Sequence, residues 1–170
     1  MHVPLAISTI PAGYEDYRYV LELRLNECAG AAHLAVLMKN PSTASAERLD
    51  PTIGKVRAWA QRHGFARVSV VNLFARRATH PAALNAHLYA AIVGSENDRY
   101  IREAAASADI VVAGWGNPNG LDPERYTRRI TEVLELLMLY PLYVIGAPTK
   151  RGHPRHGLMW HRATELALWR

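Results

Sequence analysis

Four short polar segments stand out because each directly follows an apolar run of the chain. The first spans residues 39–43 and contains Asn40, Pro41 and Ser42. The Asn40 side chain could hold a water or a ligand amide, while Pro41 fixes the turn. Backbone N–H groups after Pro41 could bind an anion. An ordinary Asn-Pro turn would have the same sequence.

The second segment begins with Asn72, which follows two valines. An asparagine at the end of a buried strand must satisfy one acceptor and two donors, and such an amide can pair with the edge of a nucleobase. An asparagine that only closes a loop is the plainer interpretation. Beyond it, Arg76 and Arg77 could neutralise phosphate or face solvent.

The third segment holds Trp115 between Gly114 and Gly116. A tryptophan at a strand end could form the wall of a pocket or stack on a ring, and it could equally pack in the core. We therefore use Trp115 mainly as an architectural landmark.

The fourth segment, residues 146–158, is rich in Gly, Pro, Lys, Arg and His. A histidine can donate a hydrogen bond to a developing oxyanion, and basic side chains can hold phosphates. A basic surface loop is the alternative. We favour a functional loop, because this is the densest polar group and it follows a strand. Its charged and histidine residues are Lys150, Arg151, His153, Arg155 and His156.

Other chemistries find no support in the sequence. It contains no Walker-type glycine loop, no Gly-x-Ser-x-Gly elbow and no His-Glu-x-x-His. The single Cys28 excludes an internal disulfide and a multi-cysteine metal site, and we expect it to be a buried apolar residue. We expect no cofactor. We also expect no metal ion, because the closely spaced His153 and His156 stand among basic side chains that would repel a cation.

Composition predicts a soluble, basic protein of one domain. A chain of 170 residues with 49% hydrophobic side chains predicts one domain over 1–170, and we expect it to be cytoplasmic and not in a membrane. The net charge is +5 and the pI is about 9.6. Residues 51–95 and 136–164 contain no acidic side chain. Such basic stretches could bind a nucleotide or a nucleic acid, with DNA favoured over RNA. A basic surface that only faces solvent would have the same charge pattern.

The elements that must position these segments alternate between strand and helix patterns. Apolar runs predict strands at 19–25, 34–39, 68–73, 110–115 and 142–145. The last four lack alternation, which is typical of parallel strands covered on both faces, while the first alternates and is expected at an edge. Helices are predicted over 51–63, 95–107 and 123–140, the first capped by Asp50. The predicted fold is an α/β three-layer sandwich with a mainly parallel central sheet. Ligands of such sheets bind at the carboxyl ends of the strands, so the four polar segments should meet there.

Several of these motifs resemble an uncharacterised bacterial domain-of-unknown-function family. They lie between about residues 19 and 160, so the resemblance covers most of the chain, but it implies almost nothing about function. The matching segments are residues 37–44 (LMKNPSTA), 50–52 (DPT), 70–79 (VVNLFARRAT), 97–98 (ND), 115–116 (WG) and 149–156 (TKRGHPRH).

The order of the strand-end landmarks is also similar to the uracil-DNA glycosylase superfamily. The corresponding landmarks here are Asn40-Pro41, residues 70–72 (VVN), residues 114–116 (GWG) and residues 156–158 (HGL). Four landmarks in the right order carry more weight than any one of them. The sequence departs from that pattern at Lys39, where glycine is usual, and at Gly157, where proline is usual. It also lacks the stacking aromatic residue just after Pro41. His153-Pro154 is an alternative to His156 for the role of the histidine in that pattern.

This second resemblance implies roles for individual residues. Asn40 would position a water against the glycosidic carbon, Asn72 would read the base edge, and His156 would stabilise charge on the departing base. Leu158 or Met159 could wedge into the vacated stack. Further ligand-binding candidates are Ser42, Trp115 and His153, and the phosphate-binding candidates are Arg76, Arg77, Lys150, Arg151 and Arg155.

Three functions therefore compete. The first is hydrolysis of an N-glycosidic bond in nucleic acid or a nucleotide, with Asn40 and His156 as catalytic residues. The second is a non-catalytic module that binds nucleic acid or a nucleotide in the same cleft. The third is a partner-binding α/β domain whose basic surface has no such role. The sequence assigns no oligomeric state.

Overall fold

The computed structural model describes residues 6–13, 15–26, 32–42 and 50–170. Cys28 and Thr43 lie outside the described residues. The strands are β1 (Ala6–Ile10), β2 (Val20–Arg24), β3 (His33–Met38), β4 (Arg67–Asn72), β5 (Ile110–Ala113), β6 (Leu142–Ile145) and β7 (Leu166–Leu168). The helices are α1 (Pro51–Arg62), α2 (Tyr89–Val93), α3 (Asn97–Ser107) and α4 (Pro123–Leu136), with short 3-10 helices η1 (Pro81–Ala86) and η2 (Gly157–Met159).

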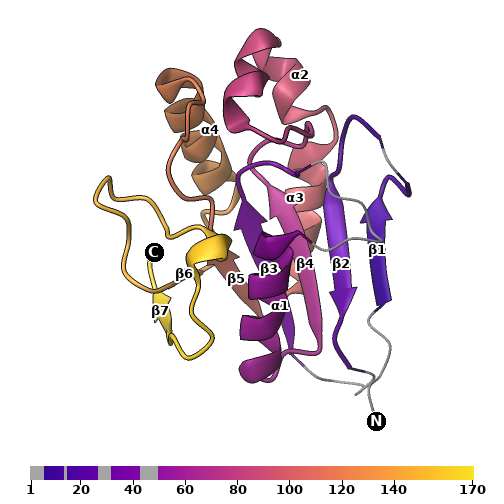
Figure 1. Cartoon of the computed structure of the whole chain (residues 1–170), viewed down its shortest axis with the longest axis vertical. Coiled ribbons are helices and arrows are strands. Elements are labelled where there is room, and N and C mark those ends of the chain that lie inside the picture. The colour runs from indigo at the N-terminus through magenta and orange to yellow at the C-terminus, as the bar shows by residue number, and fades with distance from the viewer. Residues whose placement is uncertain (1–5, 14, 27–31, 43–49) are drawn as a thin grey trace.

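The seven strands form one mixed sheet in the order β1-β2-β4-β3-β5-β6-β7 (Figure 1). Strands β4, β3, β5 and β6 are parallel to one another, whereas the pairs β1–β2, β2–β4 and β6–β7 are antiparallel. The α/β class and the parallel centre are confirmed, and the parallel arrangement is restricted to these four central strands. Strands β1 and β7 were not predicted.

The expectation that the first predicted strand lies at an edge is wrong, because β2 is paired between β1 and β4. Its alternation has another cause. Leu21 and Leu23 face the apolar core, while Glu22 on the opposite face accepts hydrogen bonds from Ser69 and Arg67. The alternation therefore marks a strand with one apolar and one polar face, which an interior strand can also have.

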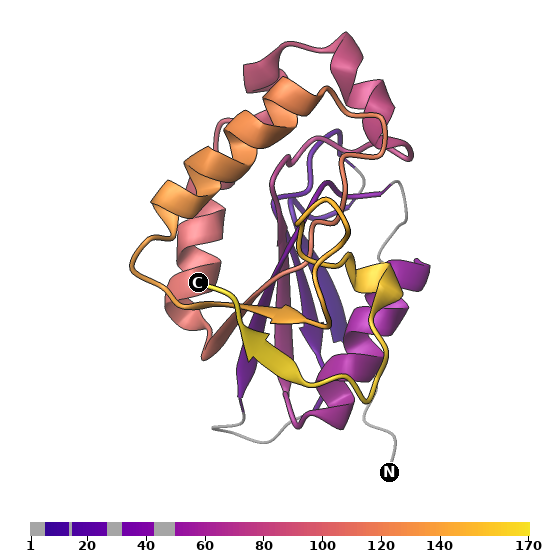
Figure 2. The same ribbon diagram turned by 90° about the vertical axis from the view of Figure 1, so that its left-hand side faces the viewer.

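Helix α1 and η2 cover one face of the sheet, as Figure 2 shows. Helix α1 begins where the sequence predicts, because the Asp50 carboxylate accepts a hydrogen bond from the N–H of Ile53 and Pro51 occupies the first turn. Its buried face packs Val56 and Trp59 against β3 and β4.

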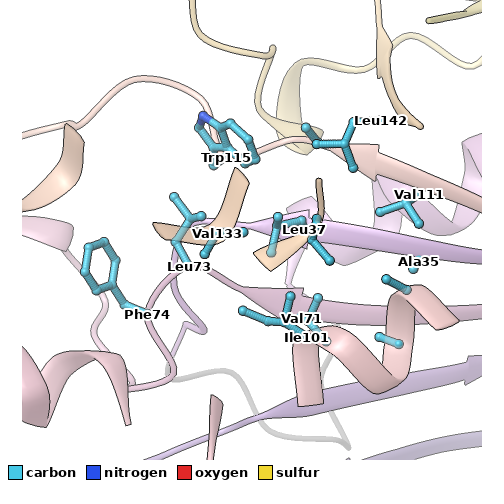
Figure 3. Close-up of a cluster of buried hydrophobic side chains, with 14 of the residues drawn as sticks. Ala35, Leu37, Val71, Leu73, Phe74, Ile101, Val111, Trp115, Val133 and Leu142 are labelled. Carbon is cyan, nitrogen blue, oxygen red and sulfur yellow. The ribbon is translucent and has the colours of Figure 1, made fainter. Parts of the chain in front are cut away.

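Helices α3 and α4 cover the other face (Figure 2). Figure 3 shows Leu37 and Val71 of the sheet in one cluster with Ile101 of α3 and Val133 of α4. Helix α4 ends at Leu136, not at 140 as predicted. The chain leaves the helix in two short turns before Pro141, and Met138 is exposed.

The order of the parallel strands fixes where a ligand can enter. Strand β3 connects through α1 to β4 on one side, and β5 lies on its other side. Such a reversal leaves a crevice outside the carboxyl ends of the strands. The segments after β3, β4, β5 and β6 all leave the sheet at this edge. Among the helices that the structure describes, none is long and apolar enough to cross a membrane.

Candidate functional site

A cavity of about 200 Å³ lies at the carboxyl ends of β3 and β4. Residues far apart in sequence contribute to it, from the segment before β2, the ends of β3 and β4, the start of α1 and the loops after β5 and β6. The polar and charged side chains that line it are Arg18, Lys39, Asn40, Ser42, Asp50, Thr52, Asn72, Thr79, Asn119 and His156.

Asn40 leaves β3 with its side chain in a fixed orientation. Its Nδ2 donates hydrogen bonds to the carbonyl oxygens of Ala78, at 2.9 Å, and Pro41, at 3.2 Å. Both amide hydrogens are thus used on backbone. The Oδ1 acceptor is the part of this side chain that can serve a ligand or a water.

Asn72 ends β4 opposite Met38 in the register of β3 and is only 1% exposed. Its carbonyl oxygen accepts a hydrogen bond from the side chain of Asn97. Its own Nδ2 is buried and has no hydrogen-bond partner among the described residues. A buried donor without a partner is unfavourable, so this amide group is available to a ligand in the cavity.

Lys39 is buried at 3% exposure beside Asn40. Its Nζ lies 5.9 Å from the centroid of the Tyr126 ring, and it has no ion pair or hydrogen bond with any residue in the described ranges. Burial lowers the pKa of Lys39 from 10.5 to about 8. A fraction of its amine is consequently neutral near physiological pH.

Arg18 supplies a second buried cation, at 4% exposure. Within the described part of the chain its Nε has no hydrogen-bond partner. Burial and the neighbouring Arg77 lower the pKa of Arg18 to about 10, and the Asp50 carboxylate opposes that shift. Arg77 itself donates a hydrogen bond to the carbonyl oxygen of Ser42 at 3.2 Å.

Asp50 is the carboxylate among the lining residues. One oxygen accepts the N–H of Ile53 at 2.8 Å, and the other accepts the hydroxyl of Ser42 at 2.6 Å. Lys39 and Arg18 together outnumber this one negative charge. The cavity therefore favours an anionic or acceptor-rich ligand.

His156 begins η2 with its ring oriented by the backbone. Its Nδ1 accepts a hydrogen bond from the N–H of Leu158 at 3.1 Å, so the neutral ring carries its hydrogen on Nε2. Burial first, and then the Lys39 charge, lower the pKa of His156 to about 4, against the opposing effect of Asp50. At neutral pH the ring is an uncharged donor.

Gly116 allows this placement of His156. Its φ is +68°, and a Cβ at this position would lie 2.8 Å from the Cβ of His156. The Gly116 N–H also donates to the carbonyl of Pro154 at 3.0 Å, which ties the loop after β5 to the loop after β6. The glycine thus fixes the loops together.

A second cavity, of about 360 Å³, adjoins the first and shares Asn119 and His156 with it. Arg155 and Thr149 also line it. Arg155 donates from Nε to the carbonyl oxygen of Ala147 at 3.1 Å. The adjoining cavity continues the site along the loop after β6.

The structure brings together Asn40, Ser42, Asn72 and His156, as the strand-end argument expects. Trp115 and His153 lie elsewhere: both line a separate cavity of about 530 Å³ beside α4. Trp115 is fully buried in the core, as Figure 3 shows, and packs edge-on against Trp169.

The predicted phosphate contacts are also dispersed. Arg76 lies over the ring of Tyr17, and Lys150 and Arg151 are exposed on the turn after β6. Of the predicted set, Arg155 lines the adjoining cavity and Arg77 contacts Ser42. Among the described residues, no group of three or more His, Cys, Asp or Glu side chains could hold a metal ion.

Sequence reasoning did not assign Arg18, Lys39, Asp50 or Asn119 to the site. Asp50 was predicted as a helix cap, and both Asp50 and Lys39 stand in motifs of the resembled family, but neither signal pointed to a ligand. Asn119 lies in the loop after β5 and adopts a positive φ of 52°. Asparagine is enriched in this conformation, so a tight turn at Asn119 could have been predicted from the sequence. Arg18 has none, because its burial depends entirely on tertiary packing.

The fold is α/β, with a cavity lined by polar side chains at the carboxyl edge of its central parallel strands. The chain belongs to the family described as "Protein of unknown function (DUF1643)", whose model matches residues 18–158. That range contains every residue that lines the cavity, from Arg18 to His156. No curated protein and no solved structure matches the chain.

Proposed function

We propose that the protein hydrolyses an N-glycosidic bond in a nucleic acid or in a nucleotide, and we favour DNA over RNA as the nucleic acid. One observation carries the proposal: Asn40, Asn72 and His156, which leave three different strands, line the same small cavity. The similarity of the strand-end landmarks to the uracil-DNA glycosylase superfamily assigns complementary roles to the same three residues.

The dimensions of the site suit a nucleobase with its sugar outside. Pockets for drug-sized ligands typically measure about 300–1,000 Å³. The cavity of about 200 Å³ is smaller than that, which suits a flipped base more than a whole nucleotide. The adjoining cavity of about 360 Å³, with Arg155 on its wall, has room for sugar and phosphate.

Asn72 would read the base. Its buried Nδ2 has no partner among the described residues, so a base carbonyl that accepts from it would satisfy the amide. The nearby Lys39 also favours an acceptor. We therefore expect a base that presents carbonyl groups to the deep end of the cavity.

Asn40 would hold the attacking water. Because both hydrogens of its Nδ2 are bonded to backbone carbonyls, Oδ1 is oriented to accept a hydrogen bond from that water. The water oxygen attacks the sugar C1′, the C1′–N bond breaks, and its electron pair leaves with the base. The water loses one proton, and the departing base gains one.

His156 and Lys39 would stabilise the departing base. The neutral His156 ring donates from Nε2 to the base oxygen on which charge develops, and Lys39 supplies positive charge to the same cavity. Asp50 would favour the positive charge that develops on the sugar. Hydrogen bonds orient His156 and Asp50, and Lys39 is buried beside them.

Base release tests the proposal directly. The substrates are duplex and single-stranded oligonucleotides that carry uracil, other deaminated bases or modified bases, together with free nucleotides. We expect release by the native protein and its loss in Asn40→Ala and His156→Ala, with both variants still folded at the assay temperature as their cooperative melting shows. His161→Ala is the matched control, because His161 is exposed and its Nδ1 accepts a backbone N–H in the same way. Equal release by the native protein and both variants would overturn the assignment, as would the lack of release from every substrate.

A second candidate is a binding module without catalysis. The excess of buried positive charge from Lys39 and Arg18 over Asp50 would favour anion binding whether or not a bond is broken. Binding to the same oligonucleotides that weakens with salt, without base release, would favour this module.

A further inference from the structure

Lys39 has an environment that the other lysines of this chain lack. The sequence contains three lysines, at positions 39, 55 and 150. Lys55 on α1 and Lys150 on the turn after β6 are exposed, while Lys39 is 3% exposed and lines the cavity. It follows β3 directly, so the strand fixes its backbone, and it precedes Asn40 in the same site.

The surroundings of Lys39 leave its amine available. The charged and titratable groups around it are Tyr126 on α4 and His153 and His156 on the loop after β6, with Asp50 and Arg18 on the cavity wall. Asp50 is engaged by Ser42 and the N-terminus of α1, and no carboxylate of the described residues pairs with Lys39. An amine without an ion-pair partner in a desolvated site is the arrangement that lysine nucleophiles need.

We propose that Lys39 is a nucleophile that captures the aldehyde of the abasic sugar as a Schiff base after the base has left. The inference rests on the proposed function, because that reaction places an abasic sugar next to Asn40. The same amine position supports base departure in its charged form and capture in its neutral form.

The step balances without any further reactant. The abasic sugar opens to its aldehyde form, and the Nζ lone pair attacks C1′. A C–N bond forms, the carbonyl π electron pair moves to oxygen, and the oxygen gains the proton that the attacking nitrogen gives up. The resulting carbinolamine loses its oxygen as water with a second proton, and a protonated imine remains. Hydrolysis of the imine returns the free amine and the aldehyde.

The acidity of Lys39 supports the capture step. With a pKa of about 8 in place of 10.5, its neutral fraction at pH 7 is about 300-fold larger than that of an ordinary lysine. Capture should therefore increase with pH up to about 8 and then level off.

Borohydride trapping tests the proposal. An oligonucleotide with a preformed abasic site is incubated with the native protein and with Lys55→Arg/Lys150→Arg, which keeps Lys39 as its single lysine. Sodium borohydride then delivers hydride to C1′ of the imine and makes the adduct permanent. Mass spectrometry of peptides locates the modified residue, which separates Lys39 from the N-terminal amine. We expect the adduct on Lys39 in both proteins and its loss in Lys39→Arg.

An adduct that is absent, or that maps to any amine other than Lys39, would overturn the inference. Mapping on the native protein does not depend on how well Lys39→Arg folds. The preformed abasic site also separates the two proposals. Base release without a Lys39 adduct would refute the Schiff base alone, and a Lys39 adduct without base release would refute the hydrolase alone.

Discussion

Replacement of Lys39 by methionine should stabilise the protein while it removes the function of the cavity. Lys39 is a buried cation without an ion-pair partner among the described residues, and methionine has a similar length without the charge. Removal of an uncompensated buried charge in favour of an apolar side chain is favourable. Functional sites often retain such unfavourable groups.

The pKa of Lys39 gives the magnitude. A decrease from 10.5 to about 8 means that folding disfavours the charged amine, and at 1.36 kcal/mol per pKa unit the effect is at most about 3 kcal/mol. Between pH 8 and 10.5 the unfolded chain holds this proton and the folded protein does not, so the stability of the native protein should increase with pH there. The full penalty applies below pH 8.

Urea unfolding at a series of pH values measures the effect. At neutral pH we expect Lys39→Met to gain about 2–3 kcal/mol, or roughly 5–10 °C in melting temperature. The gain should shrink from pH 8 to 10.5. Lys55→Met is the control, because Lys55 is exposed and should give no comparable gain. The reasoning is refuted if Lys39→Met is no more stable than the native protein, or if the gain does not change with pH.

Three other perturbations test the site. Gly116→Ala would place a Cβ 2.8 Å from the Cβ of His156, at a φ of +68°. Thermal melting should therefore show a loss of stability of about 1–3 kcal/mol, and base release should stop. Unchanged base release would contradict the placement of His156 against Gly116. Asp50→Ala and Asp122→Ala each remove a helix N-cap, so each should lower the free energy of unfolding by about 1 kcal/mol. Only Asp50→Ala should change the affinity for oligonucleotides. Equal affinities of the two variants would argue against a role for Asp50 in the cavity. The free energy of unfolding of the native protein should fall by up to about 3 kcal/mol as pH decreases from 6.5 to 4, because His156 is protonated in the unfolded chain before it is protonated in the folded protein. His156→Gln should lose this part of the acid sensitivity. Identical acid unfolding curves for the two proteins would contradict the lowered pKa of His156.

The central strands were predictable because burial on both faces leaves an unbroken apolar run in the sequence. Strands β3 and β4 are examples, with every residue from His33 to Met38 buried. Strands β1 and β7 were not, because their order comes from backbone pairing with β2 and β6. They are only five and three residues long, and every side chain in them is exposed or half-buried, so neither forms an apolar run long enough to predict a strand.

The site was predictable where it depends on topology. Asn40, Asn72 and His156 follow parallel strands, and the carboxyl ends of such strands share one edge whatever the details of packing. Trp115 shows where this reasoning fails. It also follows a parallel strand, but its ring packs in the core and lines a separate cavity beside α4. Its flanking glycines are needed because Trp160 and His156 pack against positions 114 and 116, at 2.9 Å and 2.8 Å from a Cβ there.

The unsatisfied groups of the cavity, taken together, restrict what can bind there. The Nε of Arg18 and the Nδ2 of Asn72 have no hydrogen-bond partner, and Lys39 has no ion pair, among the residues that the structure describes. Each buried donor left without a partner costs about 1–3 kcal/mol. All three are donors, so a ligand rich in acceptors recovers this free energy, whereas a ligand that presents amino groups meets further donors and positive charge. The cavity should therefore select a base by its carbonyl edge, and a base that offers only an amino group there should be rejected.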